Sequence, residues 1–196
     1  MEIKNVILDM GNVLLSYDPD YSVNLLCENE SAKAVIKKEF FGGYEWIQTD
    51  LGAITPEERL NEVKKRVPEA FHKDLEAVSD GWDVCMKPLD GAKKFFSYLK
   101  ENGYRVYLLS NASTEFYRYF PREFDIAQFD GTVVSCDLHI IKPDPEIYLY
   151  LLKKYSLRAQ ECLFVDDMEK NTDGAKAVGM NAFQFKGSYE DIKKII

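Results

Sequence analysis

Short apolar runs alternate with helix-like stretches along most of this chain. Residues 5–8, 104–109, 162–165 and 182–185 are four such runs. Because short apolar runs bounded by turn residues are typical of buried strands, we predict a strand at each of them. Strands that alternate with helices through short links favour an α/β fold with a parallel, doubly wound sheet, which is the Rossmann-like arrangement.

The helical stretches of the pattern fall into two groups. Three helices are expected between the later strands, near residues 90–101, 145–155 and 171–178. The pattern is also helical from about residue 21 to 83, directly after the first strand. We therefore predict a core formed by residues 1–15 and 87–196, and an inserted helical cap subdomain formed by residues 16–86.

One helix of the expected cap has a clear start. The segment Thr55-Pro56-Glu57-Glu58 places a hydroxyl at the capping position, a proline at the first helical position and a glutamate three residues after the cap. This combination marks a helix N-terminus.

Polar residues follow three of the predicted strands. Ligands bind in the crevice outside the carboxyl ends of parallel strands, so residues at these ends should converge although they are distant in sequence. The residues concerned are Asp9, the pair Ser110-Asn111 and the pair Asp166-Asp167. Their placement predicts an enzyme.

Composition limits the possible partners. The chain has 196 residues and a formal charge of −8, with 46% hydrophobic and 30% charged residues. This length suits one core that carries an insertion. Nucleic acid is not expected, because phosphate backbones are held by clustered Lys and Arg and no basic stripe is present. A small anionic substrate needs only a local positive site.

Cysteine spacing and apolar segment lengths point to an ordinary cytoplasmic enzyme. The four cysteines form no Cys-x-x-Cys motif, so neither a zinc site nor a redox motif is expected. No apolar segment reaches membrane-spanning length, and the start of the chain has no basic region leading into an uninterrupted apolar stretch. We expect reduced thiols, no membrane partner, and a monomer or weak homodimer.

The converging carboxylates predict a magnesium site. Asp9, Asp166 and Asp167 would repel one another at one sheet edge unless a cation neutralised them. Hard oxygen ligands of this kind suit Mg²⁺, and Gly11 can add its backbone carbonyl. With a metal also neutralising a bound phosphate, Asp9 would be free to attack phosphorus and form an aspartyl-phosphate.

Two further elements complete a phosphoryl-transfer site. Ser110, Asn111 and the neighbouring backbone N–H groups are expected to hold a phosphate oxygen. Lys142, which lies just before Pro143 and a helix start, supplies positive charge for the transferring group. Asn171 is expected either to cap its helix and orient Asp167 or to touch the metal.

Four motifs in this order resemble the haloacid dehalogenase superfamily, in its phosphatase branch with a helical cap. The motifs are Asp9-Met10-Gly11-Asn12-Val13, Leu109-Ser110-Asn111, Lys142-Pro143, and Asp166-Asp167 with Asn171 and Gly174-Ala175. The chain is most similar to the sugar-phosphatase group typified by bacterial α-D-glucose-1-phosphate phosphatase, which shares the Asp-x-Gly-Asn-Val motif and a Gly-x-Ile turn, here Gly52-Ala53-Ile54. The resemblance implies a Mg²⁺-dependent phosphatase for a small phosphorylated metabolite, such as glucose 1-phosphate.

The chain departs from the wider superfamily at Gly11. Most phosphatases of this type carry a second aspartate there, which protonates the leaving group, and a general acid contributes roughly 10²–10⁴-fold in rate. A substrate with a good leaving group, such as an anomeric phosphate, would suffer less from the loss. A cap side chain is the other possible source of the proton, with His72 as the candidate besides His139.

Two alternatives remain open from the sequence. A 2-haloacid dehalogenase also uses an aspartate nucleophile, but it has little use for Asp166 and Asp167 as metal ligands. A lapsed catalyst that now serves as a phosphate sensor or interaction domain is compatible with Gly11. A receiver-type switch is disfavoured by chain order, because its acidic pair follows the first strand.

Overall fold

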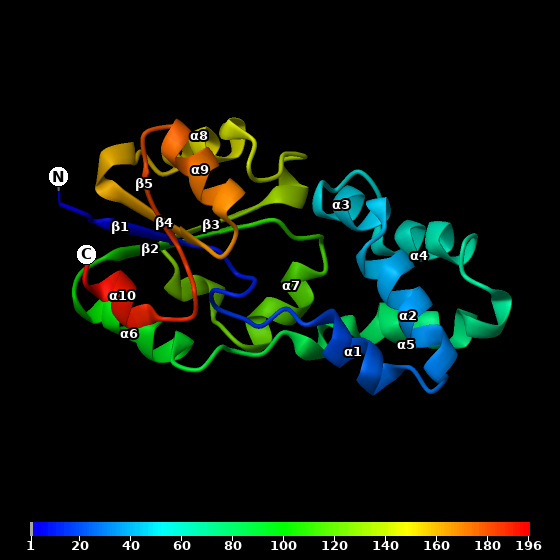
Figure 1. The fold of residues 1–196 in the computed structure, drawn as a ribbon. Coiled ribbons are helices and arrows are strands. Elements are labelled where there is room, and N and C mark those ends of the chain that lie inside the picture. The colour runs from blue at the N-terminus through cyan, green and yellow to red at the C-terminus, as the bar shows by residue number, and fades with distance from the viewer. Residues whose placement is uncertain (1) are drawn as a thin grey trace.

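Five parallel strands form a single sheet in the order β3-β2-β1-β4-β5 (Figure 1). The structure is a computed structural model that describes residues 2–196. The strands are β1 (Asn5–Leu8), β2 (Arg105–Ser110), β3 (Gly131–Val134), β4 (Cys162–Asp166) and β5 (Asn181–Gln184). Leu8 lies opposite Leu108 on one side and Val165 on the other, so three strand ends are adjacent at the carboxyl edge.

Helices cover both faces of the sheet, as a doubly wound fold requires (Figure 1). One face packs on α6 (Ala92–Glu101), α7 (Phe116–Tyr119) and α10 (Tyr189–Lys193), and the other on α8 (Pro145–Lys154) and α9 (Glu169–Ala177). Alternate residues of β1 and β2 point into these two cores, because side chains alternate along a strand. The predicted fold class is confirmed.

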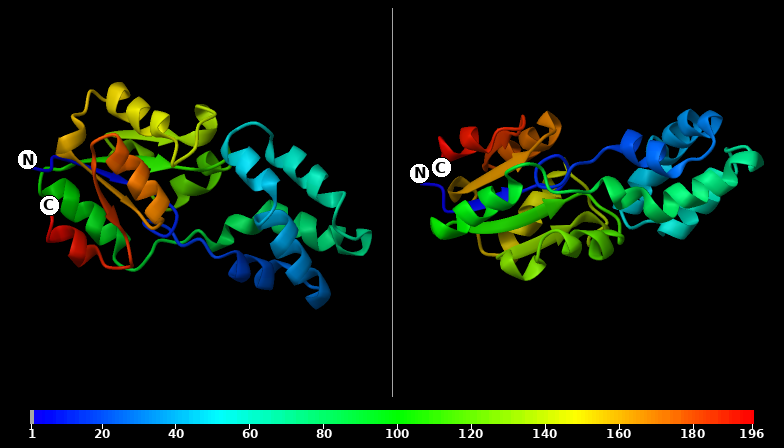
Figure 2. Two further views of the ribbon diagram at one scale, coloured as in Figure 1. Left: turned by 45° about the horizontal axis from the view of Figure 1, so that its top comes forward. Right: turned by 90° about the horizontal axis from the view of Figure 1, so that it is seen from below.

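The remaining helices lie together beyond one end of the sheet (Figure 2). They are α1 (Pro19–Leu26), α2 (Glu30–Ile36), α3 (Tyr44–Asp50), α4 (Pro56–Lys64) and α5 (His72–Gly81), with the short helices η1 (Lys37–Phe41), η2 (Glu69–Phe71) and η3 (Trp82–Cys85). We propose residues 16–86 as the cap and 1–15 with 87–196 as the core, residue 1 being outside the described part.

The chain enters and leaves the cap through adjacent segments. Ser16 N donates to Lys87 O at 2.8 Å, and Leu15 forms a bridge with Pro88. Both termini of the described chain lie at the far end of the core, away from the cap (Figure 2). The cap is therefore attached to the core by a pair of neighbouring strand-like links.

One strand was not predicted from the apolar pattern. β3 is at the sheet edge, and its first residues, Gly131 and Thr132, are half-buried. Gly131 allows the ring of Tyr155 to approach, since a Cβ there would lie 2.2 Å from the ring. Because the strand begins with a glycine and a threonine that are only half-buried, its apolar signal in the sequence is too short to predict it. The remaining short helices are η4 (Phe120–Arg122), η5 (Ile126–Gln128) and η6 (Ser135–Asp137), together with η7 (Ala159–Glu161), which directly precedes β4.

The predicted helix start at Thr55 is confirmed as a capping box. The Thr55 hydroxyl accepts from the Glu58 N–H at 3.1 Å, and the Glu58 carboxylate accepts from the Thr55 N–H at 2.7 Å. Together these bonds satisfy two backbone donors that a helix N-terminus leaves open.

We expect Thr55→Ala to lower the free energy of unfolding by about 1 kcal/mol, because it removes the capping acceptor. Thermal melting should show a decrease of about 2–4 °C for a chain of this size. Thr114→Ala, a threonine outside any helix cap, is the control and should leave the midpoint nearly unchanged. An equal shift in both variants would contradict the capping role.

No helix within residues 2–196 has the length and apolar character needed to cross a bilayer. All four cysteines are free and buried.

Candidate active site

Three carboxylates meet at the carboxyl edge of the sheet. Asp9 follows β1, while Asp166 ends β4 and Asp167 follows it. One carboxylate oxygen from each lies within 4.8 Å of the other two. Asp9 and Asp166 are buried and Asp167 is half-buried. The predicted convergence of these residues therefore exists in the folded chain.

Lys142 lies inside this carboxylate cluster. Its Nζ donates to Asp9 Oδ1 at 2.6 Å, to Asp166 Oδ2 at 2.7 Å and to the carbonyl of Leu109 at 3.0 Å. All three ammonium hydrogens thus have acceptors, which is the condition for burying a charged lysine. Burial by itself lowers the pKa of Lys142, but the two carboxylates outweigh it and the net pKa is raised.

Burial shifts the pKa of Asp9, the candidate nucleophile, in the opposite direction from that of Lys142. Burial, opposed by the charge of Lys142 and assisted by the charge of Asp166, raises the pKa of Asp9 to about 7. Burial also raises the pKa of Asp167. One lysine does not neutralise three carboxylates, so the cluster favours a second cation.

Asp166 is fixed by groups from the chain that follows it. Asn171 Nδ2 donates to both of its oxygens at 3.0 Å, and Met168 N donates to Oδ1 at 2.9 Å. Asn171 lies inside α9, whose capping residue is Met168. The expectation that Asn171 caps the helix and orients Asp167 is wrong, because α9 begins earlier and turns this side chain toward Asp166.

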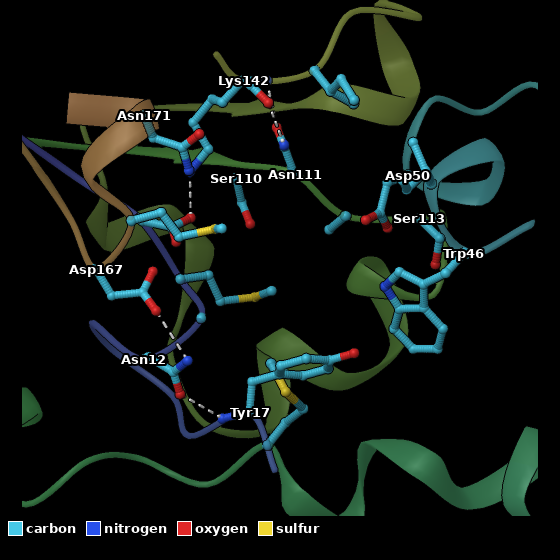
Figure 3. A pocket seen from close by; sticks show the side chains of 18 of the residues that line it. Asn12, Tyr17, Trp46, Asp50, Ser110, Asn111, Ser113, Lys142, Asp167 and Asn171 are labelled. Carbon is cyan, nitrogen blue, oxygen red and sulfur yellow. Dashed lines mark hydrogen bonds and ion pairs between the residues drawn. The ribbon is translucent and has the colours of Figure 1, made fainter. Parts of the chain in front are cut away.

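Asp167 is held by Asn12 instead (Figure 3). Asn12 Nδ2 donates to Asp167 Oδ2 at 3.1 Å, and Asn12 Oδ1 accepts from Tyr17 N at 3.0 Å. Asn12 has a φ of 53°, a left-handed conformation that asparagine tolerates better than most residues. Asn12 was not predicted as a site residue, although it lies within the first motif.

Ser110 and Asn111 are at the end of β2, as predicted, but they are arranged differently. The Ser110 side chain points into the cavity (Figure 3). Asn111 Oδ1 accepts from Lys142 N at 2.8 Å and Asn111 Nδ2 donates to Lys142 O at 3.0 Å. The Asn111 side chain thus holds the Lys142 backbone, which leaves mainly the Asn111 N–H for a phosphate.

A cavity of about 370 Å³ opens over the cluster and extends to the cap. Its core side includes all the predicted site residues except Asp166, which is fully buried beneath it. The part of its wall from residues 16–86 is largely aromatic, with Tyr17, Trp46 from α3 and Trp82 from η3, and Tyr119 at the end of α7 in the core adds another ring. Asp50 is the single carboxyl group on the cap side of this cavity.

A family model for haloacid dehalogenase-like hydrolases matches residues 3–179. The chain belongs to this family. This match confirms the predicted hydrolase and its superfamily.

Two curated relatives of this haloacid dehalogenase-like hydrolase match nearly its whole length. A sesquiterpene phosphatase, astK, from Aspergillus oryzae is 28% identical over 90% of this chain and 87% of its own. D-Ribitol-5-phosphate phosphatase from Bacteroides thetaiotaomicron is 27% identical over 93% of this chain and 91% of its own. Both relatives are named as phosphatases. The organic groups in their names, a sesquiterpene and ribitol, differ greatly in polarity.

A solved structure has a similar fold. A HAD family enzyme from Bacteroides thetaiotaomicron, in complex with magnesium and inorganic phosphate, has a TM-score of 0.72 and 25% identity, covering 95% of this chain and 96% of its own. The hydrolase described here has a donor set that fits the same metal, since three carboxylates converge and Asn171 Oδ1 is buried with no hydrogen-bond partner within residues 2–196.

His72 does not reach the cavity of this hydrolase. Its Nε2 lies 3.1 Å from Lys64 O and 2.9 Å from Val67 O, within the cap. His139 Nδ1 lies 2.9 Å from Leu51 O and is also absent from the cavity wall. Neither histidine is placed to replace the missing acid. Helical patterning in the cap does not reveal which residues face the core, so this expectation was wrong.

Proposed function

We propose that this hydrolase is a Mg²⁺-dependent phosphatase of a small phosphorylated metabolite, acting through an aspartyl-phosphate on Asp9. The observation that carries the proposal is the joint placement of Asp9, Lys142 and two further aspartates at the floor of one cavity. A phosphate brought there would meet one ammonium group and the cation that the carboxylates would hold. Bound magnesium would neutralise phosphate charge and allow an anionic nucleophile to approach.

The chain's own residues supply the remaining parts of the reaction. Asp9 presents a carboxylate oxygen to phosphorus, and Lys142 holds that carboxylate in place at 2.6 Å. Ser110 and the Asn111 N–H lie at the end of the adjacent strand, where they would bind a phosphate oxygen. The geometry is fixed before substrate arrives, which is how such sites lower a barrier.

The organic part of the substrate would lie against the cap. Trp46 and Trp82 pack edge to face, with ring centroids 4.9 Å apart, and both line the cavity. Aromatic walls suit the apolar face of a sugar ring, which supports a sugar phosphate such as glucose 1-phosphate. They also suit an apolar chain, and the relative named as a sesquiterpene phosphatase makes an isoprenoid phosphate the second candidate.

Dehalogenation is less well supported by the site. A haloacid has one carboxylate and no phosphate, and the cluster of Asp166 and Asp167 beside Asp9 would have no cation to hold. A phosphate sensor that has lost catalytic activity would not need a lysine that holds the Asp9 carboxylate in place. Phosphate hydrolysis uses every residue of the cluster.

The proposal is tested by measuring phosphate release from a panel of substrates. The panel contains sugar phosphates, including glucose 1-phosphate, together with farnesyl phosphate and nitrophenyl phosphate. We expect release that requires Mg²⁺ and stops with a chelator. Halide release from 2-haloacids without magnesium would instead support a dehalogenase. Folded, metal-binding protein that releases no phosphate from any substrate would support the sensor.

Asn171→Ala tests the metal part of the proposal. Because Asn171 orients Asp166 through two hydrogen bonds, its loss should weaken Mg²⁺ binding by about 10–100-fold. The measurement is the Mg²⁺ concentration that half-maximally raises the melting temperature. Asn181→Ala, an exposed asparagine on β5, should leave this value unchanged; an unchanged value in Asn171→Ala would remove Asn171 from the metal site.

A further inference from the structure

The proposed phosphatase lacks a proton donor next to its nucleophile. Gly11 lines the cavity, and a Cβ built there meets no atom within 4 Å. The position has room for an acidic side chain but carries none. Hydrolysis of an alkyl phosphate releases a strongly basic alkoxide, so a donor must come from another part of the cavity wall.

Asp50 is the one carboxyl group that the cap contributes to this wall. It is the last residue of α3. Figure 3 shows its carboxyl group pointing into the cavity, across from Ser110 and Asp167. An organic leaving group that extends from a phosphate on Asp9 toward the cap would pass between these two sides.

Neighbouring carboxylates at the boundary of cap and core form ion pairs with arginines, but Asp50 forms no direct ion pair with any residue in the range 2–196. Glu115 pairs with Arg59 at 3.0 Å and accepts from Trp82 Nε1 at 3.0 Å. Asp83 pairs with Arg122 and lies 3.5 Å from Arg118. Within residues 2–196, the Asp50 carboxyl group makes no hydrogen bond or ion pair, whereas its backbone carbonyl accepts from Ser135 Oγ. Its side chain is left free to interact with a ligand.

The turn that carries Asp50 is attached to the core. Asp50 O accepts from Ser135 Oγ at 2.6 Å, and Leu51 O lies 2.9 Å from His139 Nδ1. Gly52 has a φ of 67°, and a Cβ there would lie 2.4 Å from Cys136 O. Only glycine allows this approach, so the turn Gly52-Ala53-Ile54 fixes Asp50 relative to the catalytic residues of the core.

The surroundings of Asp50 keep its carboxyl group partly protonated near neutral pH. Burial raises its pKa to about 7; Glu115 and Asp9 raise it too, while Arg59 and Lys142 oppose them. The negative end of α3 acts in the same direction as burial. Tyr17, Tyr119 and Cys136 are the other titratable groups that face it. An acid with this pKa suits proton transfer at neutral pH.

We propose that Asp50 is the general acid of this enzyme, supplied by the cap in place of an aspartate at position 11. This inference rests on the proposed phosphatase function. As an Asp9 oxygen bonds to phosphorus, the bond from phosphorus to the leaving oxygen breaks, and that oxygen takes the Asp50 proton. Water then attacks the aspartyl-phosphate and gives a proton to the Asp50 carboxylate, which restores both residues and releases phosphate.

The test compares two substrates in Asp50→Asn. For an alkyl phosphate such as a sugar 6-phosphate, kcat/KM should fall by about 10²–10⁴-fold. For nitrophenyl phosphate, whose leaving group needs no proton, the loss in kcat/KM should stay under about tenfold, because the later attack of water enters kcat and not kcat/KM. The wild-type rate on the alkyl phosphate should decline above about pH 7, as Asp50 loses its proton, and this decline should vanish in the variant. Asp50→Glu, which keeps an acid, should recover part of the alkyl phosphate rate.

Glu45→Gln is the matched control, since Glu45 is on the same helix, pairs with Arg66 and does not line the cavity. It should behave as wild type on both substrates. Equal losses in kcat/KM on both substrates in Asp50→Asn, or a change in KM alone, would overturn the proton role and leave a binding role. If wild type hydrolyses neither phosphate, the proposed function fails and this inference fails with it.

Discussion

Asp9→Asn should abolish turnover, with a loss of about 10⁴-fold or more in kcat. The carboxylate oxygen is the nucleophile in the proposed reaction, and an amide of the same shape cannot form the acyl-phosphate. The neighbouring contacts of the side chain are otherwise preserved, because Asn keeps an oxygen that can accept from Lys142 Nζ. The measurement is single-turnover phosphate release at saturating Mg²⁺.

Retention of fold is checked by thermal melting of the same preparation. Asp173→Asn is the matched control, because Asp173 is an exposed carboxylate of α9 that pairs only with Lys176. It should retain full activity. Substantial turnover by Asp9→Asn would show that phosphorus is attacked by another group, and the covalent route would have to be abandoned.

Lys142→Met should be the most destabilising single substitution in the site. The Lys142 side chain is 1% exposed and bonds two carboxylates that are themselves buried. Removing one partner of a buried ion pair leaves uncompensated charge, which costs about 3–5 kcal/mol. For a chain of this length the melting temperature should fall by roughly 6–20 °C, and phosphate release should be lost as well.

The loss of stability in Lys142→Met should depend on pH, because it involves the charge of the Asp9 carboxylate. Without Lys142 the folded-state pKa of the buried Asp9 carboxyl rises further above its unfolded value of about 3.9. With Lys142 in place that folded-state pKa is about 7, so the part of the destabilisation that comes from Asp9 is small well below pH 7 and grows as the pH rises above it. Melting curves across this range would show it. Added Mg²⁺ should restore part of the stability, because it replaces the missing positive charge.

Lys100→Met provides a surface comparison. Lys100 pairs with Asp130 at 2.6 Å, but both side chains are about one-third exposed. Exposed pairs of this kind contribute about 0–1 kcal/mol, so its melting temperature should change by a few degrees at most. Similar shifts in both variants would indicate that solvent reaches Lys142 and that the cluster is open.

The sequence was sufficient for the fold and for the floor of the site. Buried strands must be apolar throughout, so the runs ending at Asp9, Ser110 and Asp166 were visible, and parallel strands bring such ends together. Thr55 and Glu58 correctly predicted a helix start, because a capping box depends on contacts between residues that are close in sequence. The edge strand at Gly131 was missed, since only two of its four residues, Val133 and Val134, are apolar and buried.

Contacts between distant segments were decided only by the tertiary structure. The sequence could not show that Asn12 holds Asp167, that Asn171 holds Asp166, or that Asn111 binds the Lys142 backbone. It also indicated His72 as a proton donor, while the residue of the cap that brings a carboxyl group to the nucleophile's cavity is Asp50. Strand ends follow from local periodicity, but the partner of a side chain depends on how cap and core pack, which no local pattern encodes.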